Sequence, residues 1–545
     1  MKNEKRKGTE NEQKQEQGSQ RSRKSNSERK KDKSKSECQN QGDKRNGGNT
    51  PLQDPFWYAK DDNAVKDIAS LPFLETLGEP LTPVASGDAV PGVMVLQYKP
   101  TIGSDSTIAD SGTNYKTRGA NAYFQYVTQG FTGGVDFEAP DLLMGALAGE
   151  SLIALMEEGR RAYGVTKYYL QQNNTYASTA VRALNFDYDD LCANLADFRA
   201  EFNIRVDQIN KTVAIPKSFA IGDRWEFISR YIFTDTDNPE WSSAIAWQMT
   251  AALQYNPVKL TTGTCLTWLK LPSTMTVDEY FAQIDTLINA LTDDDVRSMF
   301  GSIRRVYAES DLRMVEQLNE DYLTPVLRHD IVSAQVHNAC WSNDLLEGWA
   351  PNSLLTVSSE NTEDVAVYQT ANGGIHAKVL HVTTSEQDDG PTSSVLLDMY
   401  DHLAEPGNIL DITANIQVPA GRVVSATPTG STADANLLVC RSEALERVLL
   451  YNPGTTMTVP KCVNIGGSTL PNELQAIARA SHVDSHPLIY FYSSNAATPQ
   501  VYRFGFIAGE INKYTIVGTP VLAKMHEKTQ YQLLSMPSNS KSVTR

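Results

Sequence analysis

The residues with the clearest potential for metal binding or catalysis lie in one short run, His482-Val-Asp484-Ser-His486. On a β-strand alternate residues share a face, so both imidazoles and the carboxylate would point the same way and could hold a metal ion. No second cluster of metal ligands with matching spacing completes such a site. We therefore favour a polar exposed face before Pro487, and we predict neither a bound metal nor a cofactor.

Other reactive residues also have structural interpretations. His337 and Cys340 lie one helical turn apart, and we interpret them as an ordinary, partly buried pair. The acidic runs at 187–190 and 293–295 fall at expected helix starts, where the helix dipole favours negative charge. Asp235 begins a run like a calcium loop but without the required glycine and distal glutamate. The motifs GxxxxGK[ST], GxSxG and HExxH are absent, as is the GDD triplet of viral-type polymerases. We predict that the protein is not an enzyme.

The first 50 residues form a basic arm with almost no apolar side chains. They hold 15 Lys and Arg against 8 Asp and Glu, a net charge of +7, and no aromatic residue. The rest of the chain holds 34 basic and 57 acidic residues, a net charge of −23. A segment of this composition cannot bury enough apolar surface to offset the entropy lost on ordering, so we predict that the arm is disordered.

The arm has the charge and reach to neutralise phosphates but lacks the aromatic side chains needed to stack on bases. We therefore predict that it binds nucleic acid without sequence preference and with strong salt dependence. A solubilising tail or a localisation signal would have the same composition, and both readings stay open. The candidate nucleic-acid-binding residues are Lys5, Arg6, Lys7, Arg21, Arg23, Lys24, Arg29, Lys30, Lys31, Lys33, Lys35, Lys44 and Arg45.

The composition of the 545-residue chain fits a protein of several domains. Its six cysteines occur singly, which excludes a disulfide scaffold and argues against a zinc ribbon. We find no apolar run near the roughly 20 residues of a membrane helix and no secretory signal. We expect a soluble protein of a reducing cytoplasm, with no stable membrane insertion, and with the glycosylation sequons at Asn173 and Asn210 unused.

Apolar periodicity predicts a mainly helical region over about 119–345. A long helix begins near Pro140 and runs to about Lys167, and further helices are expected near 189–202 and 223–233. Thr276 and Glu279 form a capping box for a helix over 276–291, and Thr292 with Asp295 repeats the pattern for the next helix. The stripe expected to be buried on the long helix includes Leu143, Leu147, Ile153 and Met156.

After Gly348 the pattern changes to strands. Apolar runs flank Asn372-Gly373, which is typical of a hairpin. Residues 410–418 alternate between apolar and polar, which predicts a half-buried strand. Further strands are expected at 488–492 and 502–507. Helices followed by strands indicate an α+β protein with two domains.

The central segment resembles the capsid proteins of picobirnaviruses. The resemblance lies in GANAYFQYV at 119–127, GRRAYGV at 159–165, NIRVDQIN at 203–210 and IGDRWEF at 221–227. It is clearest over about 119–330 and weaker after 345. The order of a basic hydrophilic N-terminus, a helical middle and a β-richer later part also agrees with this family.

The resemblance implies a fold, a function and partners. The fold would be α+β, with a mainly α-helical shell domain and a β-rich protruding domain, preceded by the disordered basic arm. The protein would assemble with itself, as dimers with exchanged elements, into a closed icosahedral shell of a virion around viral double-stranded RNA. Assembly would take place in the host cytoplasm. In some relatives the N-terminal part is removed by the capsid protein itself, but no cleavage site can be assigned in this sequence.

The corresponding segments are 1–50 as the arm, 51–118 as an extended segment packing on the shell, and 119–345 as the shell domain. Residues 346–500 would form the protruding domain, and 501–545 the C-terminal strands and tail. Three other readings stay open: an RNA-binding scaffold that forms no shell, a hydrolase using the run at 482–486, and a partitivirus-like coat.

Overall fold

The computed structural model divides into two compact units, Met1–Leu81 and Thr82–Arg545. The described residues are 61–70, 92–103, 114–172, 177–235, 243–260, 263–341, 351–353, 365–370, 373–377, 380–383, 394–400, 402–426, 432–452, 455–465, 470–481, 483–494, 502–509 and 511–536. The basic arm lies outside them. In the first unit the described structure is one helix, α2 (Asp62–Ala69).

A six-stranded sheet runs through the second unit in the order β15-β14-β1-β3-β2-β6. β1 lies in its interior, antiparallel to β14 and parallel to β3. Its residues Val93–Leu96 are almost fully buried, which explains the unbroken apolar run VMVL. The strands are β1 (Val93–Pro100), β2 (Ile232–Thr234), β3 (Ala244–Met249), β6 (Val326–Arg328), β14 (Glu443–Asn452) and β15 (Thr455–Thr458).

This sheet differs from the arrangement expected from sequence. Within the segment 51–118, which we expected to pack on the shell, β1 instead occupies the interior of the sheet. β14, from the predicted protruding domain, pairs along the whole of β1. The two predicted domains therefore share a sheet, because strands distant in sequence supply the neighbours that β1 needs. The domain boundaries themselves stay a prediction.

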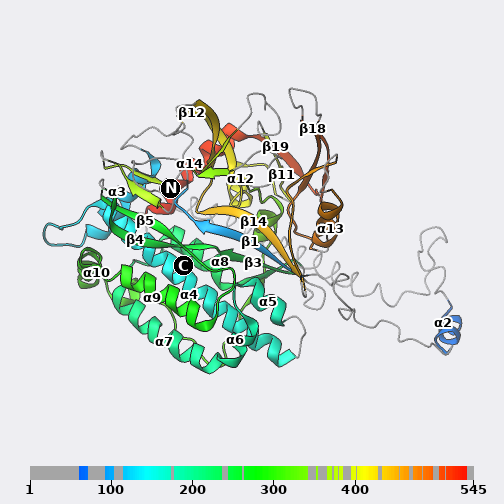
Figure 1. Ribbon diagram of the computed structural model, residues 1–545, viewed down its shortest axis with the longest axis horizontal. Helices are drawn as coiled ribbons and strands as arrows, with labels where there is room; N and C mark the ends of the chain where they lie inside the picture. The colour runs from blue at the N-terminus through cyan, green and yellow to red at the C-terminus, as the bar shows by residue number, and fades with distance from the viewer. Residues whose placement is uncertain are drawn as a thin grey trace, which may run out of the picture. The chain divides into compact units, whose positions relative to one another are not determined.

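The helices of the second unit gather mainly on one side of this sheet, around the long helix α4 (Figure 1). The long helix predicted from Pro140 is confirmed, and the four residues of its predicted stripe are buried. Residues 189–202 form parts of two helices, and Phe233 belongs to β2. The helices from this part of the chain are α3 (Tyr115–Thr128), α4 (Ala139–Gln172), α5 (Ala177–Ala183), α6 (Tyr188–Ala193), α7 (Leu195–Thr212), α8 (Ala220–Arg230), α9 (Val277–Ala290) and α10 (Asp294–Val306), and α11 (Asp330–His337) follows β6.

The predicted capping signals are largely confirmed. The Thr276 side chain accepts a hydrogen bond from the Glu279 N–H, and the Glu279 carboxylate accepts one from the Thr276 N–H, as a capping box requires. α10 begins one residue later than expected, with Asp293 as its N-cap. The Asp293 carboxylate accepts the Asp295 N–H at 3.1 Å, in place of the predicted Thr292.

A four-stranded sheet, β4-β5-β8-β9, contains strands that the sequence analysis did not predict. β4 (Ala251–Leu260) and β5 (Gly263–Lys270) fall within the region expected to be mainly helical. The hairpin predicted around Asn372-Gly373 is confirmed by the antiparallel pairing of β8 (Val365–Gln369) with β9 (Ile375–Ala377). Gly373 has a φ of +73°, a conformation that glycine adopts without steric cost.

The later part of the chain adds shorter sheets, and the strands predicted at 488–492 and 502–507 are confirmed as β17 and β18. The sheets follow the orders β12-β13-β10-β7, β11-β19 and β16-β17-β18. The strands are β7 (Pro351–Ser353), β10 (Leu380–Thr383), β11 (Ser394–Asp398), β12 (Val418–Ala426), β13 (Thr432–Val439), β16 (Cys462–Asn464), β17 (Ile489–Ser494), β18 (Tyr502–Ala508) and β19 (Tyr514–Gly518). The helices of this part are α12 (Pro406–Ile412), α13 (Leu470–Ala480) and α14 (Thr519–Leu534). Together, these elements confirm the α+β class.

The strand predicted over 410–418 is wrong. Its first residues belong to α12, which Pro406 starts, and a turn follows. Three of its four polar residues, Thr413, Asn415 and Gln417, are buried, and Asp411 is exposed. Gln417 Nε2, for example, donates to the Leu445 carbonyl at 2.5 Å. The alternation therefore reflects internal hydrogen bonding and not a solvent-facing strand.

Candidate functional site

The thirteen basic residues predicted to bind nucleic acid all belong to the arm and lie outside the described residues.

The run His482–His486, for which we favoured a polar exposed face, is described from Val483 onwards. His486 is buried, so the exposed face is wrong at that residue. His482 lies outside the described residues, and elsewhere among them no group of three His, Cys, Asp or Glu side chains could hold a metal ion. The Asp484 N–H donates to the Asp235 carboxylate at 3.1 Å, and His486 Nδ1 lies 2.8 Å from the Pro487 carbonyl oxygen. Burial lowers the pKa of His486, and Lys461 and His337 lower it further. These contacts shape a turn.

His337 and Cys340 are both buried, and the partner of His337 is a carboxylate. His337 Nδ1 lies 2.9 Å from the His486 carbonyl oxygen, and Nε2 lies 3.4 Å from Asp398 Oδ2. Burial acts to raise the pKa of Asp398, but hydrogen bonds from His337 and from backbone N–H groups outweigh it and lower the pKa. Burial also raises the pKa of the Cys340 thiol. The His337–Asp398 pair joins α11 to the end of β11.

The long helix α4 buries five charged side chains, a feature that the sequence analysis did not use. They are Glu150, Glu157, Glu158, Arg160 and Arg161, each at most 2% exposed. Buried charges require partners, because taking an unpaired charge out of water is costly. The partners come from β3, from α8 and from the segment 309–325, so α4 connects these parts of the fold.

Arg161 and Glu158 join α4 to the sheet. Arg161 donates to the Ile228 carbonyl at 2.9 Å and to the Trp247 carbonyl at 2.6 Å. The Glu158 carboxylate lies 3.7 Å from Arg161 and accepts the Met249 N–H at 2.9 Å. Burial raises the pKa of Glu158 to about 7, although Arg161 and the Met249 N–H oppose the shift.

Arg313 joins α4 and α8 to the 309–325 segment. Its Nε lies 2.9 Å from Glu150 Oε1, its Nη1 lies 2.6 Å from Glu226 Oε2, and its Nη2 contacts Asp223. One guanidinium therefore meets three carboxylates. Burial raises the pKa of Glu150 to about 8, with Arg313 opposing and the two other carboxylates adding to the shift.

Two asparagines of α7 hold the same segment by its backbone. The Asn210 amide accepts the Val315 N–H at 2.8 Å and donates to the Val315 carbonyl at 2.9 Å. Asn203 makes the same two bonds to Leu318, at 2.7 and 3.1 Å. Each side chain thus acts as a neighbouring strand would. Because the Asn210 amide nitrogen is engaged in this way, the fold leaves it unsuited to carry a sugar; Asn173 lies outside the described residues.

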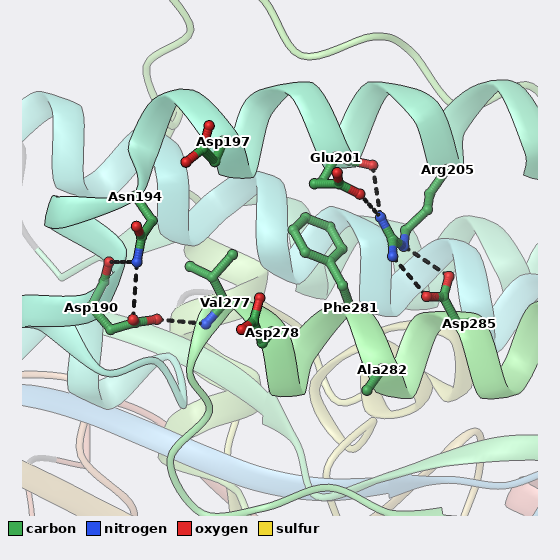
Figure 2. A pocket seen from close by; sticks show the side chains of 10 residues that line it. All are labelled: Asp190, Asn194, Asp197, Glu201, Arg205, Val277, Asp278, Phe281, Ala282 and Asp285. Atoms are coloured by element: carbon green, nitrogen blue, oxygen red, sulfur yellow. Dashed lines mark hydrogen bonds and ion pairs between the residues drawn. The ribbon is translucent and has the colours of Figure 1, made fainter.

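A polar groove of about 390 Å³ lies between α7 and α9, with the end of α6 beside it (Figure 2). Arg205 crosses it, donating to both Asp285 oxygens at 2.8 and 2.7 Å and to Glu201 at 2.6 Å. Its guanidinium stands over the Phe281 ring at 4.4 Å. At the other end Asp190 accepts the Val277 N–H at 2.7 Å. The groove contains acceptors and one cation that is paired with two carboxylates, and these contacts join the helices.

Comparison with known proteins gives the context for this fold. A family model described as the picobirnavirus capsid protein matches residues 57–347, more than half of the chain. The chain belongs to the picobirnavirus capsid protein family. It is a structural protein of the virion.

Two relatives agree with this assignment over nearly the whole length. The capsid protein precursor of human picobirnavirus (strain Human/Thailand/Hy005102/-) is 24% identical over 519 residues, covering 89% of this chain and 91% of its own. A crystal structure of the picobirnavirus capsid is similar in fold, with a TM-score of 0.70 at 21% identity, over 90% of this chain and 99% of that one. The similarity to these picobirnavirus capsid proteins therefore extends well beyond residues 57–347, the segment that the family model matches.

The buried charges of α4 had a sequence signal that we did not use. The run GESLIALMEEGRRAYG places five charged residues in an otherwise apolar helix. Such residues can be exposed on one face or buried with partners, and spacing alone does not decide between them. The run also belongs to an apolar segment, Ala139–Lys167, that is long enough to cross a membrane by length and composition, contrary to our expectation. Inside the structure 89% of that window is buried, as in the core helix of a folded protein.

Proposed function

We propose that this picobirnavirus capsid protein assembles as dimers into a closed icosahedral shell around double-stranded RNA. Assembly takes place in the host cytoplasm, and the basic arm contacts the packaged RNA without reading its sequence. The protein has no enzymatic activity in this proposal. Support for the coat role comes from the family membership, and support for the RNA role comes from the separation of charge along the chain.

The observation that carries the RNA role is the net charge of +7 on residues 1–50 against −23 on the rest. Double-stranded RNA hides its base edges in a deep, narrow major groove and presents phosphates and 2′-hydroxyls. A cationic segment without aromatic residues suits that surface. An acidic body would repel RNA. Most of the inner wall of a shell built from it would then not bind the genome, which would stay mobile.

The first experiment asks whether the purified full-length protein forms particles. Electron microscopy and sedimentation velocity should reveal large closed particles whose yield rises with protein concentration and changes with salt. A protein that stays dimeric or smaller under all these conditions, with RNA affinity in the arm, would contradict the shell and support the RNA-binding scaffold.

The second experiment separates the arm from the shell. Deleting residues 1–45 should leave particles intact but lower their RNA content. The matched control keeps the length of the arm and replaces its lysines and arginines with glutamine, so that charge alone changes. Both variants should lose RNA. Unchanged RNA content in either set of particles would contradict the role of the arm charge.

A further inference from the structure

A buried contact between two histidines joins α11 to the turn that precedes β17. His337 Nδ1 lies 2.9 Å from the His486 carbonyl oxygen, and the Leu488 N–H donates to the His337 carbonyl at 3.0 Å. The centroids of the two imidazole rings are 6.3 Å apart. His337 is 1% exposed and His486 is 7% exposed, so water reaches little of either ring. We call the contact made by His337, His486 and Leu488 the histidine joint.

The surroundings of His337 suit a positively charged ring. Its Nδ1 faces the His486 carbonyl oxygen, and its Nε2 lies 3.4 Å from Asp398 Oδ2. A carbonyl and an ionised carboxylate accept hydrogen bonds and cannot donate them. Only the imidazolium form carries a proton on both ring nitrogens, so this form meets both neighbours.

The surroundings of His486 suit a neutral ring. Its Nδ1 lies 2.8 Å from the Pro487 carbonyl oxygen, which an Nδ1–H of the neutral ring already satisfies. Burial lowers the pKa of His486, and the nearby positive charges of His337 and Lys461 lower it further. The Pro487 carbonyl and the Asp484 carboxylate act in the other direction but do not outweigh burial and the two cations.

Lys461 keeps a permanent positive charge beside the histidine joint. Its side chain is buried, and its Nζ donates to the Ala339 carbonyl at 2.7 Å, directly after the end of α11. A proton on His486 would therefore add a further positive charge to a buried region that already holds Lys461 and suits a charged His337. Buried charges of like sign are unfavourable because little water separates them.

The remaining titratable groups around the joint do not neutralise that proton. The Asp398 carboxylate already serves His337, and the Asp484 N–H is held by the Asp235 carboxylate at 3.1 Å. Burial raises the pKa of Asp235, so its own protonation favours the closed form as the pH falls and opposes the effect of His486. Burial also raises the pKa of Tyr400, which therefore stays neutral in acid.

We propose that the histidine joint is sensitive to acid: protonation of His486 beside Lys461 and His337 opens the contact between α11 and the turn before β17. The inference concerns the single chain and does not depend on the proposed shell. Opening would bring Val483 and Leu488, each at most 1% exposed, into contact with water. A fall in pH would thus loosen the coat protein at one defined place, without cleavage and without a bound ligand.

The size of the effect follows from the ordinary pKa of histidine. In the open form His486 lies in water with a pKa of about 6.5, whereas in the closed form it resists protonation. Because the closed form binds the proton less well than the open form, falling pH favours the open form. Through His486 alone, the ratio of open to closed form should rise about tenfold between about pH 7.5 and about pH 5.5.

Hydrogen exchange of the unassembled full-length protein measures this opening. Exchange of the backbone amides over 484–494, read by mass spectrometry and corrected for the intrinsic effect of pH, should accelerate on acidification. His486→Gln cannot become charged and keeps an N–H donor for the Pro487 carbonyl. Between about pH 7.5 and about pH 5.5, the exchange rate of the unaltered protein divided by that of His486→Gln should rise about tenfold. Other titrating groups cancel in this ratio because both proteins carry them.

His329→Gln supplies the matched control, because it removes an exposed imidazole at the start of α11. This variant should keep the full acceleration over 484–494. An acceleration that persists in His486→Gln, or one that disappears in His329→Gln, would overturn the inference. If His486→Gln does not fold, the unaltered protein still decides: exchange over 484–494 that does not accelerate relative to 277–290 of α9 would overturn it as well.

Discussion

At the scale of single residues, the unusual feature is that one guanidinium serves three carboxylates. Replacing Arg313 with Met would leave Glu150 buried without a cation while roughly preserving the side-chain volume. Removing one partner of a buried ion pair costs about 3–5 kcal/mol, so we expect Arg313→Met to lower the free energy of unfolding by about that amount. Urea denaturation of the unassembled protein measures it.

The control for this variant is an ion pair of the same type in water. Arg297 lies 3.6 Å from Asp294, and both side chains are mostly exposed. Arg297→Met should therefore leave the urea midpoint unchanged. If Arg313→Met were equally silent, the buried pair would not stabilise the contact between α4 and the 309–325 segment.

The same cluster predicts a pH dependence of stability. The pKa of Glu150 is raised from 4.5 to about 8 and that of Glu158 to about 7, both first because of burial. Between the unfolded and folded values the folded protein binds protons that the unfolded chain has released, so rising pH favours unfolding. Stability from these two groups is complete below about pH 4.5 and is lost as the pH rises towards 8.

Asp398 acts in the opposite direction. Its pKa is lowered in the fold, so its contribution is present above the unfolded pKa and is lost as the pH falls through the folded value. Between about pH 5.5 and about pH 8 the stabilising contributions of Glu150 and Glu158 fall, whereas that of Asp398 does not change. We therefore expect the urea midpoint to be higher at about pH 5.5 than at about pH 8. Glu150→Gln should flatten that slope. A slope unchanged in Glu150→Gln would show that Glu150 is not one of the groups that titrate.

At the scale of elements, the close contact between α4 and α9 depends on a glycine, Gly159. A Cβ on Gly159 of α4 would lie 2.2 Å from the hydroxyl oxygen of Tyr280, whose ring is fully buried on α9. Alanine is favoured over glycine inside a helix by about 1 kcal/mol, but overpacking of this kind costs about 1–3 kcal/mol. We expect Gly159→Ala to destabilise the protein in thermal unfolding.

Gly301 supplies the matched control. It lies in α10, and a Cβ there would meet nothing within 4 Å. Gly301→Ala should therefore stabilise the protein by about 0.5–1 kcal/mol through helix propensity alone. A stabilising Gly159→Ala would mean that Tyr280 moves easily and that the contact between α4 and α9 is loose.

The elements also separate what sequence can predict from what it cannot. The start of α9 followed from Thr276 and Glu279 because a capping box involves only neighbours in sequence. β3, β4 and β5 were missed because short apolar runs fit a buried strand and a buried helix equally well. The 410–418 alternation misled for a related reason, since Asn415 and Gln417 are polar yet buried by bonds to distant residues.

The candidate sites divide in the same way. Composition alone predicts phosphate binding by the arm, because that property needs only charge and reach. The ion pairs of α4 could not be predicted, since a pair such as Arg160 and Glu316 joins positions 156 residues apart. Only the fold decides which charges meet.

At the scale of the whole molecule, the separation of charge makes a prediction about RNA that does not depend on particles. The unassembled full-length chain should bind double-stranded RNAs of unrelated sequence equally well. If six or more phosphates are contacted, affinity should fall by roughly a thousandfold or more between about 50 and 200 mM salt. Filter binding with labelled duplexes and unrelated competitors measures both properties.

The body alone should behave differently, because its net charge of −23 opposes phosphate binding. A chain without residues 1–45 should show no measurable binding at the same salt concentrations. The arm would then be the whole source of affinity, and its lack of aromatic residues would be the reason for the equal affinities. A preference for one sequence, or binding that survives removal of the arm, would place a base-reading or phosphate-binding surface on the folded body.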